Sequence, residues 1–274
     1  IHPDEDDPHG WQAVAAAAEQ RDAPLLISVG DPWDVQGLVP VRQARPAMRW
    51  VAVTPVDSTP YPKLVLIRRD PHQYLDVSYT LRHADRIVSF APFGAEAIGA
   101  MLAGPATPGG PQTTPEIETV LLGVDREVFA PRDRTAARQV FTGGVADDAL
   151  LFTAIKVNSI RAGFDTLLEA WARYLALAAQ VDEALAARSR LYVHTAPGGP
   201  GYALPLLMER YGVGASVLFN PALGPGAPVT VDELVDVHAS TDVAVSAARA
   251  EGFGLPILEA LACGVPAVVP AYGA

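Results

Sequence analysis

One stretch near the end of the chain most constrains its fold, because it places a helical segment between two short apolar runs. The runs are DVAVS at 242–246 and VPAVV at 265–269, and their β-branched residues are typical of strands. Between them lies EGFGLPILEALACG at 251–264, where Pro256 suits the first helical position and Gly264 the left-handed helix end. The stretch therefore predicts a strand, loop, helix, strand unit.

The predicted helix places Glu259 within or just after its first turn. Backbone N–H groups and the positive end of the helix dipole favour an ionised carboxylate there. Gly252 and Gly254 precede the helix and let the backbone approach a ligand closely. A ligand with phosphate groups and vicinal hydroxyls would fit this place. The alternative is an ordinary buried helix whose glutamate only interacts with the dipole.

Two glutamates, Glu251 and Glu259, have seven residues between them in EGFGLPILEALACGVP. This pattern resembles the signature of retaining GT-B glycosyltransferases of the GT4-like, or group 1, family, which includes sucrose synthases, trehalose synthases and bacterial mannosyltransferases. NSIRAGFDTLLEAW at 158–171 is similar to the phosphate-binding segment of that family, and GVDREVFAP at 123–131 is similar to its interdomain junction.

The resemblance implies an α/β chain with the GT-B fold, in which two Rossmann-like, doubly wound parallel-sheet domains face a cleft. It implies that Glu259 binds ribose hydroxyls, that Glu251 contacts the donor sugar, and that backbone amides hold sugar or phosphate. The predicted site residues are Glu251 and Arg161 for catalysis, and Lys156, Gly252, Phe253, Gly254, Leu255 and Glu259 for binding the nucleotide sugar.

The implied reaction transfers a sugar from a UDP- or GDP-sugar to an unknown acceptor with retention of configuration. Negative charge grows on the departing phosphate, and amides at helix starts together with Arg161 can stabilise it. The resemblance implies no covalent enzyme intermediate, with the leaving phosphate helping to deprotonate the acceptor. No metal is then required, and no cofactor is expected besides the donor.

The chain departs from the family pattern at several positions. Ala162 follows Arg161 where the family usually has Lys, which makes Lys156 a candidate substitute, and Leu122 stands where His is common. If position 162 faces the donor diphosphate, a lysine restored there is expected to raise turnover. The first glycine-rich loop and the terminal helices of the family are not found, so both domains are expected to be incomplete.

The composition fits a globular protein with two domains. The chain has 274 residues, 50% of them hydrophobic and 19% charged. The predicted division is an N-terminal domain at 1–131, a linker at 132–146 and a C-terminal domain at 147–274. Cys263 is the single cysteine, which excludes an internal disulfide and a cysteine cluster for zinc.

Charge and hydropathy exclude two classes of partner. The net charge of −11 argues against a nucleic-acid binder, which normally presents a basic face to phosphates. No apolar run of about 18 residues exists, so no membrane span is predicted. The acidic start IHPDEDD is unlike a signal peptide, but it lacks Met, which indicates a further N-terminal part. A cytoplasmic location is the default expectation, and the oligomeric state stays open.

Apolar runs alternate with amphipathic stretches along the chain, which predicts βαβ units and parallel sheets. Strands are predicted at 25–29, 49–53, 86–90, 117–122, 150–155, 191–194, 217–219 and 242–246. Helices are predicted at 11–19, 35–44, 93–102 and 204–211, from a cap at Asp165 to about 178, and from a Thr230–Glu233 capping box onwards.

Polar residues after two of the strands are weaker candidates. Asp31 and Asp57 follow the strands at 25–29 and 49–53, at the edge where parallel sheets bind ligands, and are assigned to the acceptor side. The alternative is that both are helix caps or turn residues. The histidines share no metal-ligating spacing and are expected to be surface or capping residues: His72, His83, His194 and His238.

Three functions stay open. The first is the retaining glycosyltransferase, and the second is a degenerate member that binds a nucleotide sugar without turnover. The third, a nicotinamide-dependent oxidoreductase, is disfavoured because no GxGxxG follows a strand.

Overall fold

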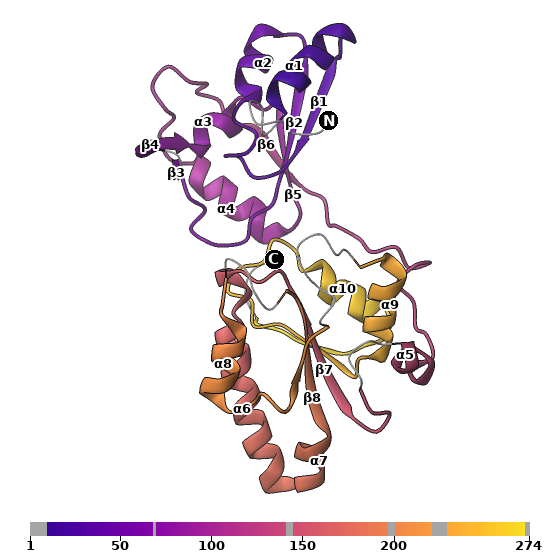
Figure 1. Cartoon of the computed structure of the whole chain (residues 1–274). Coiled ribbons are helices and arrows are strands. Elements are labelled where there is room, and N and C mark those ends of the chain that lie inside the picture. The colour runs from indigo at the N-terminus through magenta and orange to yellow at the C-terminus, as the bar shows by residue number, and fades with distance from the viewer. Residues whose placement is uncertain (1–9, 68–69, 141–144, 197–200, 221–228, 272–274) are drawn as a thin grey trace. The chain divides into compact units, whose positions relative to one another are not determined.

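The computed structural model describes residues 10–67, 70–140, 145–196, 201–220 and 229–271 (Figure 1). His72 lies in a strand of the first unit, but its side chain is outside this description. The chain divides into two compact units, and the first consists of the residues up to Leu122 together with Glu251–Phe253. The second runs from Gly123 to Ala250 and continues from Gly254. The division after Leu122 comes before the predicted boundary at 131.

A four-stranded parallel sheet forms the first unit, in the order β1-β2-β5-β6. Its strands are β1 (Leu25–Val29), β2 (Arg49–Thr54), β5 (Arg86–Ser89) and β6 (Glu116–Thr119). Its helices are α1 (Trp11–Gln20), α2 (Leu38–Ala44), α3 (Val77–Arg82) and α4 (Pro92–Leu102). The core contains Trp50, Ile87 and Ile98, each 0% exposed. The predicted parallel sheet is confirmed.

An antiparallel pair of strands, β3 (Leu64–Ile67) and β4 (Asp70–Asp76), was not predicted. The sequence DPHQYLD of β4 lacks the alternation of apolar and polar residues that identifies a half-buried strand. Asp76 ends this strand and caps α3, since its carboxylate accepts hydrogen bonds from the backbone N–H of Ser78 and Tyr79. The hairpin therefore leads directly into a helix that the sequence pattern also failed to show.

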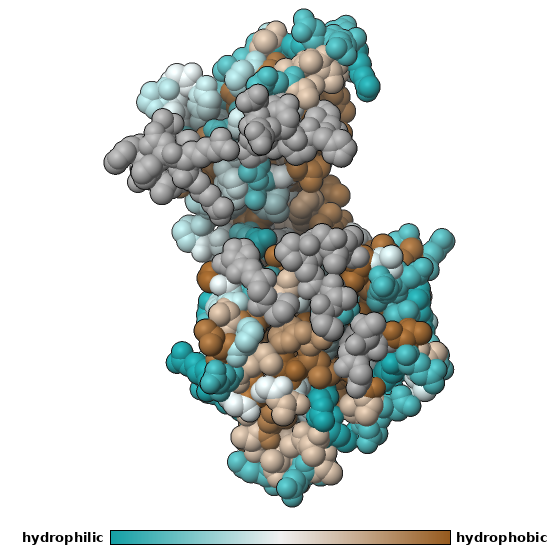
Figure 2. Space-filling model, viewed as in Figure 1, coloured by the Kyte–Doolittle hydropathy of each residue, from teal (hydrophilic) through white to brown (hydrophobic). Residues whose placement is uncertain are grey.

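The outer face of the edge strand β1 is apolar. Leu25, Ile27 and Val29 alternate along it and are exposed, and Figure 2 shows hydrophobic surface along this edge of the first unit. Alternate residues of a strand share one face of the sheet. No residue that the structure describes covers these three side chains.

The second unit contains a five-stranded parallel sheet in the order β11-β10-β7-β8-β9. Its strands are β7 (Leu150–Ile155), β8 (Ser189–His194), β9 (Val217–Leu218), β10 (Val243–Val245) and β11 (Ala267–Val268). In this sheet β7 is the first strand along the sequence and lies in the centre. The strands β8 and β9 follow on one side of it, and β10 and β11 lie on the other. The sheet is therefore doubly wound, as predicted, and its order reverses between β7 and β10.

Helices cover both faces of this second sheet (Figure 1). They are α6 (Phe164–Val181), α7 (Glu183–Arg188), α8 (Leu204–Tyr211), α9 (Val231–Ser240) and α10 (Leu255–Ala262). The core beneath α6 and α8 includes Phe164, Leu168 and Leu191. A second cluster, beneath α9 and α10, includes Val235 and Ala260.

The segment predicted as a linker, 132–146, contains α5 (Arg134–Val140) and is part of the second unit. Arg138 is 4% exposed and donates hydrogen bonds to the carbonyl oxygens of Ser240 and Ala149 at 3.0 and 2.9 Å. It also pairs with Asp242 at 2.7 Å. A buried arginine therefore anchors this segment to the sheet and to α9, and its assignment as a linker stays a prediction.

Among the described residues, none of the helices combines the length and the apolarity that crossing a bilayer requires.

Candidate functional site

The loops after β7 and β10 define the site, because they leave the carboxyl ends of the two strands between which the sheet order reverses. Crevices at such a switch point are the usual ligand sites of open α/β sheets. The first loop carries Lys156 and Arg161, and the second leads to α10 and Glu259. Three of the predicted site residues thus come from one edge of the second unit.

Lys156 and Arg161 form a pair of cations on the loop after β7. Burial, together with the charge of the nearby Arg161, lowers the pKa of Lys156 to about 8. Like charges brought this close repel each other, and an anion placed beside both would relieve that repulsion. The loop therefore holds two cationic side chains close together without a lysine at position 162.

Ala162 is buried, at 4% exposure, in the core cluster that includes Phe164 and Leu168. A short 3₁₀ turn, Ile160–Ala162, directs this side chain inward while the loop continues to Gly163. The condition under which a lysine at position 162 is expected to raise turnover, that this position faces the donor diphosphate, is therefore not met by the buried side chain. The cap of α6 also differs from the prediction, since Gly163 is at the N-cap and Asp165 lies in the first turn.

Asn158 fixes the shape of the loop. Its side chain is 3% exposed, accepts a hydrogen bond from the backbone N–H of Tyr202 at 2.8 Å and donates one to the Tyr202 carbonyl at 2.8 Å. A Cβ on Gly201 would lie 2.4 Å from the Asn158 Oδ1 atom, so the two segments are in close contact. This double hydrogen bond ties the loop after β7 to the segment that precedes α8.

Arg249 joins the two loops of the site. Its backbone N–H donates to the carbonyl of Arg161 at 2.8 Å. Its guanidinium donates to the Tyr202 hydroxyl at 2.6 Å and pairs with Asp165 at 2.5 Å. Burial alone would raise the pKa of Asp165, but Arg249 and further hydrogen bonds lower it overall. The sequence interpretation missed the roles of Asn158, Tyr202 and Arg249, because each links segments that are distant along the chain.

Helix α10 begins at Leu255, after Gly254 with a φ of +87°, and Gly264 follows its end with a φ of +81°. These left-handed positions favour glycine, as the sequence predicted. Glu259 lies just after the first turn, and its side chain is 16% exposed. The carboxylate is therefore held near the protein interior but remains accessible at the edge of the unit.

Two histidines lie in the interior of the second unit, and one of them contacts Glu259. His238 lies in the last turn of α9, is 2% exposed, and its Nε2 atom lies 3.4 Å from Glu259 Oε2. His194 ends β8 at 9% exposure, and its Nδ1 atom lies 2.9 Å from the Tyr192 hydroxyl. Burial and the proximity of His238 lower the pKa of His194. The expectation that these two histidines are surface or capping residues is wrong.

Glu251, Gly252 and Phe253 group with the first unit, whereas the helix that follows them belongs to the second. The part of the candidate site that lies in the second unit thus contains Lys156, Arg161 and Glu259, and the role of Glu251 stays a prediction.

The weaker candidates, Asp31 and Asp57, both lie close to Tyr61 in the first unit. Burial raises the pKa of Tyr61, and the two carboxylates raise it further. The structure thus gathers two acids and a buried tyrosine near the ends of β1 and β2. Their assignment to the acceptor side stays a prediction.

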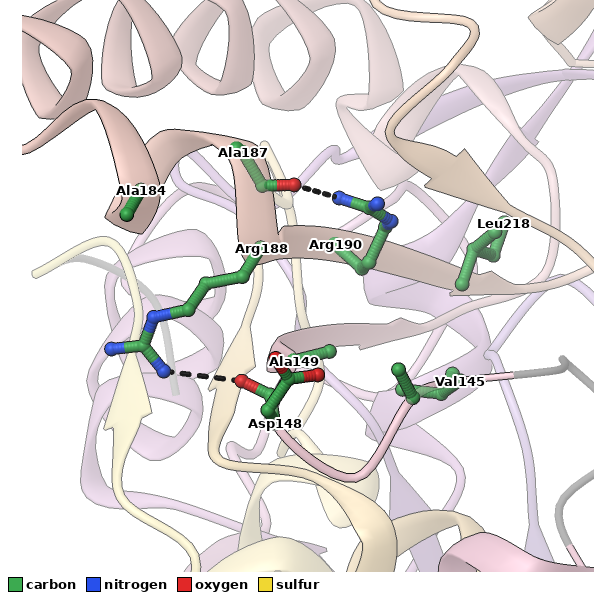
Figure 3. A pocket seen from close by; sticks show the side chains of 9 residues that line it. Val145, Asp148, Ala149, Ala184, Ala187, Arg188, Arg190 and Leu218 are labelled. Carbon is green, nitrogen blue, oxygen red and sulfur yellow. Dashed lines mark hydrogen bonds between the residues drawn. The ribbon is translucent and has the colours of Figure 1, made fainter.

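A pocket of about 420 Å³ lies elsewhere in the second unit (Figure 3). Its lining comes mainly from the segments that lead into β7 and β8, including Asp148, Arg188 and Arg190. Arg188 donates to the Asp148 carbonyl at 3.1 Å, and Arg190 donates to the Ala187 carbonyl at 2.8 Å. These segments enter the sheet at its amino edge, opposite the loops of the site, so this pocket is no part of it.

Within the described part of the chain, no three His, Cys, Asp or Glu side chains gather as a metal site would require.

Residues 204–274 match the family model of the glycosyl transferases group 1. A D-inositol 3-phosphate glycosyltransferase of Geodermatophilus obscurus is 40% identical over 152 residues, which are 55% of this chain and 32% of that protein. The matched region thus spans about a third of the curated relatives' length.

Two solved structures resemble the whole chain. The sucrose-phosphate synthase of Thermosynechococcus elongatus has a TM-score of 0.71 at 17% identity over 96% of this chain and 60% of its own. A UDP-forming trehalose-phosphate synthase of Burkholderia xenovorans has a TM-score of 0.65 at 13% identity, over 97% of this chain and 64% of its own. The fold is therefore that of the GT-B glycosyltransferases. The match of residues 204–274 to the group 1 family model confirms the predicted resemblance.

Proposed function

We propose that the chain is part of a retaining glycosyltransferase that moves a sugar from a UDP- or GDP-sugar to an acceptor hydroxyl. The observation that carries the proposal is the joining of two loops at the switch point of the second sheet. One loop supplies the cation pair Lys156 and Arg161, and the other supplies α10 with Glu259. Arg249 connects the loops through its hydrogen bond to Arg161.

Each group has a distinct role in this proposal. Lys156 and Arg161 hold the diphosphate, because charge-assisted hydrogen bonds to phosphate are about twice as strong as neutral ones. Glu259 accepts hydrogen bonds from the vicinal hydroxyls of the ribose. The start of α10 directs backbone N–H groups and the positive end of its dipole toward the sugar or phosphate.

The chemistry is the departure of a sugar from a diphosphate. Two fixed cations stabilise the charge that grows on the leaving phosphate, and the site then has no need of a divalent cation. We assign to the leaving phosphate the proton of the acceptor, on the face from which the phosphate departs. Glu251 contacts the donor sugar in this scheme, and Asp31 and Asp57 serve the acceptor.

The test is calorimetric titration with UDP, GDP and their sugar conjugates, followed by assays of sugar transfer and of donor hydrolysis. Inositol 3-phosphate is the first acceptor to try, because the curated relatives are named for it. We expect Glu259→Gln to bind about ten- to hundredfold more weakly, since a hydrogen bond to a charged group contributes about 1.5–3 kcal/mol. Unchanged affinity would contradict the ribose role.

Binding without transfer or hydrolysis would instead favour a nucleotide-sugar-binding protein without turnover. Activity that EDTA abolishes and manganese restores would contradict metal independence.

A further inference from the structure

The buried histidine at the end of α9 lies directly behind the proposed ribose-binding carboxylate. His238 Nε2 is 3.4 Å from Glu259 Oε2, the His238 side chain is 2% exposed and that of Glu259 is 16% exposed. The Oε2 atom of Glu259 therefore faces the buried histidine, while the Glu259 side chain as a whole stays partly exposed. The two residues come from different helices, α9 and α10, so that their separation is fixed by how these helices pack.

Two further rings, those of Phe129 and His194, lie beside the His238 ring. The Phe129 ring lies edge-on to it at 6.0 Å between centroids. His194, on β8, is near enough for His238 to lower its pKa, and the His194 ring is held in turn by the Tyr192 hydroxyl. The imidazole is thus enclosed by an aromatic ring, a second histidine and the carboxylate.

A glutamate carboxylate needs such support to hold one orientation. Its terminal torsion is broad, and it offers two oxygens with about four lone-pair sites. A donor fixed on one oxygen selects one rotation of the group and leaves the other oxygen for a ligand. The separation of 3.4 Å between His238 Nε2 and Glu259 Oε2 is at the long end of the range for a hydrogen bond.

We infer that His238 is a positioning residue of the nucleotide site, whose Nε2–H holds Glu259 Oε2 so that Glu259 Oε1 meets the vicinal ribose hydroxyls. The inference rests on the proposed function, because it requires a nucleotide at this edge. His238 would then help to determine the preference for a ribose that keeps both hydroxyls, although it lies behind Glu259 and does not itself touch the ligand.

The experiment compares two ligands across a set of variants. The two ligands are UDP and 2′,3′-dideoxy-UDP, or GDP and 2′,3′-dideoxy-GDP if the guanine nucleotide binds better. The members of each pair differ only in the two ribose hydroxyls that would donate hydrogen bonds to Glu259. The measured quantity is the ratio of their dissociation constants, the hydroxyl ratio. His238→Leu removes the donor, and His238→Gln keeps an amide N–H near the position of Nε2. Ser240→Ala is the matched control, since the hydroxyl of this buried serine on α9 donates to the Val237 carbonyl and not to Glu259.

In the wild-type chain we expect a hydroxyl ratio of about ten to a hundred. His238→Leu should reduce the ratio to about threefold or less while binding the dideoxy ligand as the wild type does, and His238→Gln should restore most of it. Ser240→Ala should leave the ratio unchanged. A purely structural role would weaken both ligands equally and leave the ratio intact, which would overturn the inference.

The proposed function and the inference fail differently. If the wild-type chain binds neither nucleotide, or binds both equally, the proposed function itself is wrong at this edge and the inference falls with it. If the wild type shows the ratio and His238→Leu keeps it, only the inference is wrong. Should His238→Leu fail to fold by circular dichroism, His238→Asn takes its place. The shorter amide moves the donor away from Oε2 and should lose the ratio in the same way.

Discussion

The backbones of Gly163 and Ala247 touch where the loops after β7 and β10 meet. A Cβ on Gly163 would lie 1.9 Å from the Ala247 carbonyl oxygen, and the φ of Gly163 is +69°, in the left-handed region. Both facts require a residue without a side chain. This contact lies between the turn that carries Arg161 and the segment that leads to α10, so the two halves of the candidate site depend on it.

Gly163→Ala should therefore lower the free energy of unfolding by more than the roughly 1–2 kcal/mol that left-handed backbone costs other residues. The loops must also separate, so nucleotide affinity should fall. Gly212→Ala is the matched control, with a φ of +67° and no atom within 4 Å of its Cβ. It should show the backbone cost alone. Equal losses by urea denaturation would mean that the close approach contributes nothing.

A second prediction concerns pH and the cation pair. Because the pKa of Lys156 is about 8, its ammonium is neutralised as the pH rises from 7 to 9. Only the protonated form attracts a diphosphate, so the affinity should fall by up to about tenfold over this range. Titrations of wild type and Lys156→Met at several pH values provide the measurement, and the variant should bind weakly with a flat profile.

Unfolding cannot account for such a loss. The folded pKa of Lys156 lies below the usual lysine value of 10.5, so between these two pH values the unfolded chain binds more protons. Stability contributed by this residue thus rises with pH in that window, opposite to the affinity. A wild-type affinity that stays constant between pH 7 and 9 would contradict a role for the Lys156 ammonium.

His194 carries a third prediction, for acid conditions. Burial and the proximity of His238 lower its folded pKa below the usual histidine value of 6.5. As the pH falls through 6.5, His194 binds a proton in the unfolded chain but not yet in the folded chain. The free energy of unfolding therefore decreases below pH 6.5 because of this residue. His194→Asn keeps a polar group near the Tyr192 hydroxyl and removes the titration. Urea denaturation at pH 7.5, 6.5 and 5.5 should show a steeper loss for the wild type, and parallel losses would contradict the prediction.

The elements that the sequence predicted best are those with mostly apolar residues, such as β1 (Leu25–Val29), β7 (Leu150–Ile155) and α8 (Leu204–Tyr211), whose bounds agree with the structure. Elements with polar sequences were missed. In α5, Arg138 is buried because carbonyl oxygens and Asp242 surround it, and nothing local to the sequence shows those partners. The residue pattern of one segment does not reveal the hydrogen-bond and ion-pair partners that another segment provides.

The same limit applies to the candidate site. The sequence identifies Arg161 and Glu259 because they stand in motifs that resemble a known family, and it offers Lys156 as a substitute for the lysine that the family usually has at position 162. Arg249 and His238 act through contacts with segments far along the chain, which a reading of local patterns cannot find. Arg249 stands only two residues before Glu251, and a cation so close to the motif is the one signal that could have identified it.

The last prediction reverses what the sequence suggested for position 162. Ala162→Lys should not raise turnover, because the 4% exposed side chain points into the core rather than toward a phosphate. Overpacking a well-packed core typically costs 1–3 kcal/mol, and the ammonium must also be buried or forced out through the turn. Ala179→Lys, on the exposed part of α6, is the matched control and should change stability by no more than about 0.5 kcal/mol. Urea denaturation and donor turnover of both variants decide the point. A rise in turnover for Ala162→Lys with unchanged stability would show that the turn at 160–162 rotates to present this position to the donor.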